Sequence, residues 1–105
     1  MNATVTHLAP RDVIAIHDLD TEGAILSALL CDDAAGKHWA SCAPLLRAEM
    51  FWADANRYVF EAIEALRLDG KQADPVSVCA VMRRRDTLGK SGGPVYVAET
   101  LATCQ

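Results

Sequence analysis

Apolar residues recur at three- and four-residue steps through most of the chain, and this spacing places them on one face of a helix. The clearest stripe lies between a candidate N-cap at Asp54 and a candidate helix-ending glycine at Gly70. Its members are Val59, Phe60, Ile63 and Leu66. The pattern predicts a central helix that turns these four side chains toward the core and organises the rest of the chain.

The pattern also predicts contacts for residues next to this stripe. Phe51 and Trp52 come just before the cap, so we expect both rings to fold back on the stripe. Glu64 and Arg67 lie three residues apart and mostly off the stripe. Their spacing predicts a weak ion pair on the solvent side of the central helix.

A first helix is predicted to begin after Asp18, which is a good N-cap. Asp20 and Glu22 then lie in the first turn, where their charges suit the positive end of the helix. Two adjacent carboxylates at 32–33 suit the negative end badly and should end the helix. Its predicted core positions are Ile25, Leu26 and Leu29.

Three further helices are predicted. A weaker one is expected over residues 35–43, before a proline that breaks or restarts it. Another is expected over residues 74–85, because it opens with an Asp-Pro pair that suits an N-cap and first helical position. A glycine-rich loop over 86–93 then leads to a last helix beginning at Pro94. The core positions predicted on these helices are Trp39, Val78, Met82 and Tyr96.

These elements predict an all-α fold, a compact orthogonal bundle of five to six short helices. The chain has 105 residues, of which 51% are apolar, so one domain with its own core is expected. Residues 1–15 show no helical period and are interpreted as a flexible lead-in. The helical domain is predicted over residues 16–105.

The net charge of the chain is −4 at pH 7. Because neutralising phosphates needs a basic face, a mildly acidic domain is a poor nucleic-acid binder by itself. No run of about eighteen apolar residues is present, so no membrane span is predicted. Residues 1–10 lack the pattern of a secretory signal, which favours the cytoplasm.

Four cysteines are present, and none forms a Cys-x-x-Cys pair: Cys31, Cys42, Cys79 and Cys104. The first three lie inside apolar helical patterns, where a free thiol behaves as a small core group. In a cytoplasmic protein, reduced thiols are therefore expected rather than a disulfide framework.

The segment Gly89-Lys90-Ser91 resembles the end of a phosphate-binding loop. Such a loop needs a glycine five residues before its Gly-Lys pair, a preceding strand and a following helix. Position 84 is Arg84, and a helix is predicted before the loop. The segment is interpreted as a tight connection between helices, so no ATP site is predicted in this chain.

Histidines and cysteines offer one candidate metal pair. His38 and Cys42 lie four residues apart and share a helix face, but no second ligand pair follows at zinc spacing. The simpler interpretation is a core thiol beside a surface histidine, and a metal- or thiol-dependent enzyme stays the alternative. His7 and His17 have no acid or nucleophile near them in the sequence.

Charged clusters give one candidate contact surface. Arg83, Arg84 and Arg85 form the only basic run. It is either a solvated helix end that suits the dipole or a contact to an acidic partner or phosphate backbone. The carboxylate pairs at 32–33 and 61/64 have helix-surface spacings, so acid–base catalysis is not predicted.

Taken together, these pieces resemble the N-terminal domain of the DnaB family of bacterial replicative DNA helicases. The match runs from about Ile16 to Leu101, with Asn56 where the family usually has histidine. Its parts, in the family's order, are the opening helix at 17–30, the Asp32 turn with Trp39, the aromatic pair Phe51-Trp52, the central helix around 57–63, the joint at 73–78, and the closing Gly92-Gly93 with Tyr96-Val97-Ala98-Glu99.

The resemblance implies a domain without catalytic, cofactor or metal residues. In the family, ATP and Mg belong to a RecA-like ATPase domain that does not occur in this sequence. The family's N-terminal domain forms a collar, as a dimer or a trimer of dimers, and contributes to docking of primase or a helicase loader. DNA would be contacted only through the full-length helicase. The alternative is a stand-alone phage or plasmid relative that modulates a host helicase.

Overall fold

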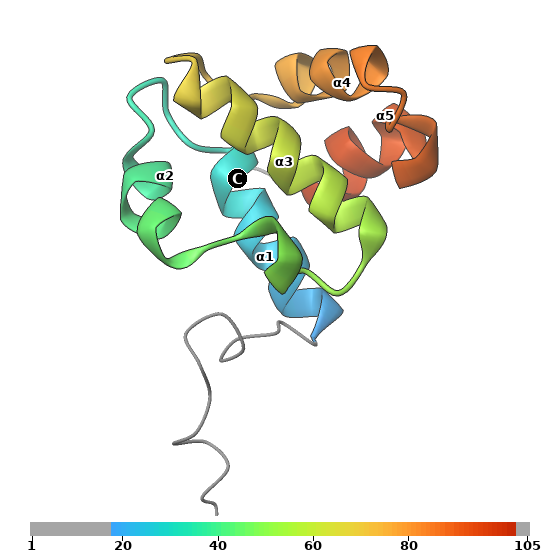
Figure 1. Ribbon diagram of the computed structural model, residues 1–105, viewed down its shortest axis with the longest axis horizontal. Coiled ribbons are helices and arrows are strands. Elements are labelled where there is room, and N and C mark those ends of the chain that lie inside the picture. Colours follow the sequence, from blue (N-terminus) through green and yellow to red (C-terminus); the bar gives the residue numbers. More distant parts are fainter. Residues whose placement is uncertain (1–17, 103–105) are drawn as a thin grey trace, which may run out of the picture.

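The computed structural model describes residues 18–102. Within this range the α-helices are α1 (Leu19–Leu30), α2 (Lys37–Cys42), α3 (Asp54–Leu68), α4 (Pro75–Arg84) and α5 (Gly93–Val95). Short 3₁₀ turns lie at η2 (Ala43–Leu45), η3 (Ala48–Met50) and η4 (Gly89–Ser91), and a π-helical stretch, η5 (Tyr96–Leu101), continues α5. No β-strand occurs among these residues (Figure 1), and the all-α prediction is confirmed.

The predicted lead-in at residues 1–15 lies outside the described part of the chain, as do His7, His17 and Cys104. No helix within residues 18–102 has the length and apolar character needed to cross a bilayer.

Helix α3 runs diagonally through the middle of the molecule, with α2 on one side and α4 and α5 on the other (Figure 1). It packs against α1, α4 and the turns η3 and η4. Val59, Phe60 and Ile63 are fully buried on it, because their spacing keeps them on one face. The Phe60 ring lies 5.1 Å from that of Phe51 and 6.0 Å from that of Trp39, measured between centroids.

The predicted core positions divide by burial. The buried ones are Leu26, Leu29, Phe51, Val59, Phe60, Ile63, Leu66, Val78 and Met82. Three are partly buried and pack against this cluster: Ile25, Trp39 and Tyr96. The pattern did not single out Met50, Ala62 and Leu88, which are also buried. Trp52 departs from expectation, since its side chain is 65% exposed and only Phe51 of the pair lies in the core.

Two of the predicted helix starts are confirmed. The Asp18 carboxylate accepts a hydrogen bond from Asp20 N at 2.9 Å and caps α1. The Asp74 carboxylate accepts from Ser77 N at 3.2 Å and caps α4, with Pro75 in the first position. Each cap satisfies an N–H group that the helix itself leaves without a partner.

The predicted starts of α3 and α2 are wrong. Helix α3 begins at Asp54 with Ala53 as its N-cap, and no side chain of its own caps it. The Asp54 carboxylate instead pairs with Arg57 at 2.7 Å. Helix α2 spans only Lys37–Cys42, because the preceding segment forms a loop that ends at Gly36 with a φ of 74°.

The cysteine prediction is wrong for one residue. Cys31 is disulfide-bonded, whereas Cys42 and Cys79 are free. Spacing along the sequence carries no signal for such a bond.

Candidate functional site

One buried polar cluster joins three helices. Glu22 on α1 is fully buried, and its carboxylate faces the start of α3. It accepts hydrogen bonds from Trp52 N at 2.6 Å, Ala53 N at 3.4 Å and the Asn56 side-chain amide at 2.8 Å. The Tyr96 hydroxyl in turn donates to the side-chain oxygen of Asn56. Glu22 lies in the first turn of α1, as predicted, but its hydrogen bonds reach the start of α3.

This cluster anchors the backbone just before α3, at Trp52 and the N-cap residue Ala53. The carboxylate of Glu22 binds N–H groups at the helix start, where the helix dipole also favours a negative charge. Burial and the nearby Glu22 charge raise the pKa of Tyr96, and its hydrogen bond to Asn56 partly opposes them. Glu22 thus acts as a structural link between helices, in contrast to a carboxylate open to a substrate.

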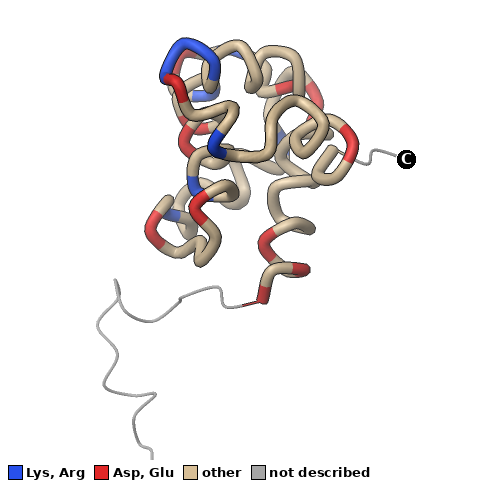
Figure 2. Tube along the Cα trace, turned by 90° about the vertical axis from the view of Figure 1, so that its right-hand side faces the viewer, with Lys and Arg blue, Asp and Glu red and all other residues tan. Residues whose placement is uncertain are grey.

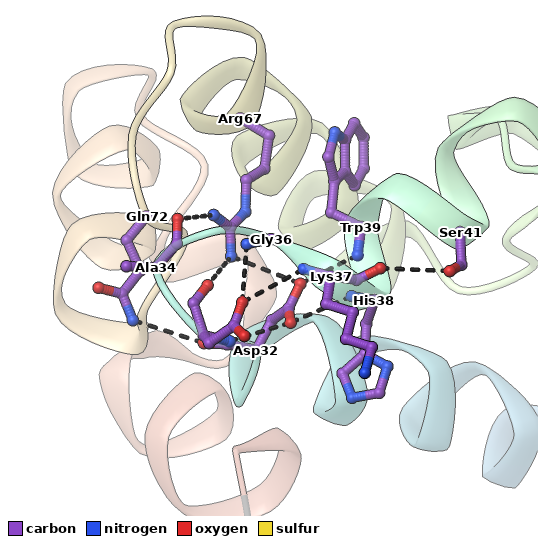
Figure 3. Close-up of polar contacts among 10 residues, drawn as sticks. Asp32, Ala34, Gly36, Lys37, His38, Trp39, Ser41, Arg67 and Gln72 are labelled. Atoms are coloured by element: carbon purple, nitrogen blue, oxygen red, sulfur yellow. Dashed lines mark hydrogen bonds and ion pairs between the residues drawn. The ribbon is translucent and has the colours of Figure 1, made fainter.

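A second polar cluster surrounds Asp32, which is 5% exposed (Figure 3). Its carboxylate accepts hydrogen bonds from Asp33 N at 2.9 Å, His38 N at 3.1 Å and Trp39 N at 2.9 Å. The Arg67 guanidinium lies 3.6 Å away. Burial would raise the pKa of Asp32, but these N–H donors and Arg67 outweigh it and hold the pKa below the ordinary value.

Arg67 has a different role from the one predicted. Its guanidinium donates to Asp33 O at 2.9 Å and Ala34 O at 3.1 Å, and it pairs with Asp32 (Figure 3). Only 5% of the Arg67 side chain is exposed to solvent. The predicted solvent-side pair with Glu64 is therefore wrong. The end of α3 instead holds the loop that leads into α2.

Gly36 makes room for this guanidinium. A Cβ atom at position 36 would lie 3.0 Å from a terminal nitrogen of Arg67, and the positive φ there also favours glycine. The Nε atom of Arg67 is buried without a hydrogen-bond partner. The two terminal nitrogens of the guanidinium thus make all of its hydrogen bonds, and they make them to the loop that precedes α2.

The other residues considered as possible catalytic, phosphate-binding or metal-binding groups do not come together in one site. Lys90 is exposed on a 3₁₀ turn that follows α4, so the loop lacks the preceding strand of a phosphate-binding loop. His38 is exposed and Cys42 is half-buried against the core. Among residues 18–102, no three His, Cys, Asp or Glu side chains gather as metal ligands would. Glu61 and Glu64 are half-buried on α3.

The basic run ends α4. Arg83 and Arg84 lie in its last turn, Arg85 is its C-cap, and all three are exposed. Figure 2 shows the run as the longest blue stretch of the tube, at the opposite end of the molecule from the acidic start of α1.

Four residues of the two polar clusters were missed as structural partners: Glu22, Asp32, Asn56 and Arg67. One signal for Glu22 was available, because it lies one helical turn before Leu26 on the core face of α1. A charged residue at a core position calls for a buried partner. The partners themselves lie 30 or more residues away, as with Trp52, and no local pattern identifies them.

Comparisons with known proteins agree with this architecture. Residues 14–105 match the family model described as the DnaB-like helicase N terminal domain. The replicative DNA helicase DnaB of Pasteurella multocida is 30% identical over 89 residues, which cover 85% of this chain and 18% of that protein. The replicative DNA helicase DnaB of Treponema pallidum is 32% identical over 82 residues, with 78% and 18% covered.

A solved structure is also similar. The crystal structure of the N-terminal domain of DnaB helicase from Mycobacterium tuberculosis superposes with a TM-score of 0.75 and 32% identity, covering 82% of this chain and 58% of that one. The chain therefore spans less than a fifth of the length of the two DnaB relatives and little more than half of the solved N-terminal-domain chain. From the family match and these likenesses, the chain belongs to the DnaB-like helicase N-terminal domain family.

Proposed function

We propose that this chain acts as the non-catalytic collar domain of a replicative DNA helicase. In this role it associates with further copies of itself and docks primase or a helicase loader during DNA replication. The observation that carries the proposal is the match to the Mycobacterium tuberculosis domain, at a TM-score of 0.75 over 82% of the chain. Contact with DNA would occur through the full-length helicase.

The buried polar groups of the described residues have structural partners, which supports the non-catalytic part of the proposal. The carboxylates of Glu22 and Asp32 are buried and hold helix starts, and Arg67 holds a loop. A catalytic acid or base instead needs access to a substrate proton. In the proposed arrangement this chain carries no cofactor, and ATP with Mg would be bound by an ATPase domain elsewhere in the helicase.

The proposal is tested by light scattering over a range of concentrations and by pull-down with the cognate primase and full-length helicase. We expect concentration-dependent self-association and retention of at least one of these proteins. A strict monomer that retains neither primase nor helicase would contradict the proposal. Measurable ATP hydrolysis by the purified chain would contradict its non-catalytic part.

A separate test distinguishes the collar from a stand-alone modulator of a host helicase. Sequencing the gene beyond codon 105 should reveal a segment of the form Gly-x-x-x-x-Gly-Lys-(Ser/Thr), which binds nucleotide phosphates in ATPase domains. A stop codon close to Gln105 would favour the modulator. In that case, addition of the chain should change the activity of the host helicase.

A further inference from the structure

A hollow of about 330 Å³ lies between the C-terminal parts of α3 and α4. Its apolar lining includes Leu66 and Val81, which are 8% and 5% exposed and therefore form its floor. The exposed side chains at its rim are Asp69, Lys71, Arg84 and Arg85. The hollow thus has a small apolar base, most of which the core already covers, and a charged rim. On this rim Lys71 pairs with Asp69, and Arg84 and Arg85 carry the remaining positive charge.

The basic run divides between two surfaces. Arg84 and Arg85 line this hollow, whereas Arg83 lines a separate one between α4 and the segment that begins at Pro94. The charge of Arg83 also acts on Cys79, which lies beside that second hollow. The three adjacent arginines at the end of α4 therefore line two different hollows. A substitution of Arg83 can serve as a control for substitutions of Arg84 and Arg85.

The fold makes little use of the charges of Arg84 and Arg85. Arg57, Arg67 and Lys71 each lie in an ion pair, at 2.7, 3.6 and 3.0 Å from a carboxylate. Within residues 18–102, neither Arg84 nor Arg85 forms an ion pair. Their contribution to the fold is limited to the interaction of a cation with a helix C-terminus, which is about 0.3–1 kcal/mol at an exposed site.

The charge pattern favours an acidic protein segment over nucleic acid. A nucleic-acid surface gains its affinity by neutralising several phosphates. On this rim Lys71 pairs with Asp69 at 3.0 Å, so only Arg84 and Arg85 are left for a ligand, on a chain of net charge −4. An apolar floor also has no counterpart in a phosphate backbone. By contrast, an acidic amphipathic helix can present an apolar side chain with carboxylates flanking it three or four residues away.

We propose that the hollow at the ends of α3 and α4 docks an acidic amphipathic segment of a partner protein. Carboxylates of the segment pair with Arg84 and Arg85, where planar guanidinium groups can each bind one carboxylate through two hydrogen bonds. An apolar side chain of the segment covers Leu66 and Val81. The inference stands independently of self-association, because it concerns this surface alone.

The test uses a synthetic probe in place of the natural partner. The probe is a fluorescent helical peptide of about 15 residues, roughly four turns, with Glu and Leu on one face. A peptide with Lys in place of Glu and a single-stranded oligonucleotide of similar length serve as comparison probes. Fluorescence anisotropy measures affinity, and amide chemical shifts of the labelled chain locate the contact.

We expect the acidic peptide to bind and to shift the amides of residues around 65–71 and 81–85. The double change Arg84→Glu and Arg85→Glu should weaken binding at least tenfold, because each carboxylate of the peptide then meets a like charge. The matched change Arg83→Glu should alter the affinity less than about twofold, since rim charges outside a contact act only weakly. Melting curves should show that both variants fold.

Several outcomes would overturn the inference. They are failure of the acidic peptide to bind at millimolar concentration, equal loss of affinity in the Arg83→Glu variant, and tighter binding of the oligonucleotide or of the Lys peptide. If the double variant does not fold, the neutral pair Arg84→Gln and Arg85→Gln replaces it. That pair should also reduce the affinity relative to Arg83→Gln, and an unchanged affinity would refute the assigned surface.

Discussion

The carboxylate of Glu22 and the side-chain amide of Asn56 lie 2.8 Å apart, although 34 residues separate them in the chain. Both residues are buried, Glu22 completely. Through this contact, α1 provides the negative group that α3 needs at its start. The start of the central helix therefore depends on a residue of another helix.

Replacing Glu22 by Ala should destabilise the domain by about 2–5 kcal/mol, because it leaves one buried and two partly buried donors without this acceptor, and a buried donor without a partner costs roughly 1–3 kcal/mol. The donors affected are the backbone N–H groups of Trp52 and Ala53 and the amide of Asn56. Urea unfolding monitored by circular dichroism measures the change. The control is Asp20→Ala, which truncates an exposed acidic residue two positions earlier. Equal effects of the two changes would contradict the assigned role.

Replacing Phe60 by Ala should lower the unfolding free energy by about 3–5 kcal/mol, since it removes a large buried ring and leaves a cavity. The ring is fully buried against Phe51 and Trp39. Leu68→Ala on the same helix is the control, because Leu68 is 77% exposed and should change stability by less than about 0.5 kcal/mol. A melting curve of the Phe60 variant that overlays the wild type would refute the assigned inner face of α3.

Asp32 should make stability depend on pH in the acid range. Its pKa in the folded state lies below the ordinary value, so its contribution is fully present above the pKa of the unfolded state. The contribution is then lost as pH falls through the lower folded pKa. Unfolding free energies measured from about pH 6 down to about pH 2 should fall more steeply for the wild type than for Asp32→Asn.

The control for this pH dependence is Asp54→Asn. Asp54 is 74% exposed in its pair with Arg57, and such surface pairs contribute little. This variant should keep the acid dependence of the wild type. If Asp32→Asn and wild type lose stability in parallel, the Asp32 cluster does not cause the acid sensitivity.

Cys42 should react with iodoacetamide faster than Cys79. Burial raises the pKa of the Cys79 thiol, although the charge of Arg83 partly opposes this effect, and the residue is 7% exposed. Both factors reduce the amount of accessible thiolate, which is the reactive form. Peptide mass spectrometry after short exposure to the reagent measures the two rates. Faster labelling of Cys79 in the folded protein would show that α4 opens readily.

The sequence predicted the fold wherever a local pattern determined it. The stripe through Val59, Phe60 and Ile63 placed the central helix, and Asp18 and Asp74 located two helix starts. Each of these signals lies within a few residues of the structure it determines, so periodicity and capping rules were sufficient.

The predictions that failed depended on contacts over long distances in the sequence. Asp54 satisfies the local rule for a cap, but Glu22 binds the N–H groups at the start of α3. Arg67 has Glu64 nearby in the sequence, yet its guanidinium binds Asp33 and Ala34, more than thirty residues earlier. Local rules point to the partner that is nearest in the sequence. In both cases tertiary packing brought a distant group into a buried contact instead.

The surface candidate was predicted only in part. The run of three arginines was visible in the sequence as one basic feature. Its division between two hollows was not, because it depends on where α3 and the segment after Pro94 lie against α4.

The anchoring of the α3 start by Glu22 has a consequence for how the domain assembles. A peptide covering residues 51–70 alone would lack the carboxylate that holds Trp52 N, Ala53 N and the Asn56 amide, and it should be largely unstructured in water. Ordering of the central helix and docking of α1 are therefore coupled, so the two should form and melt as one cooperative unit.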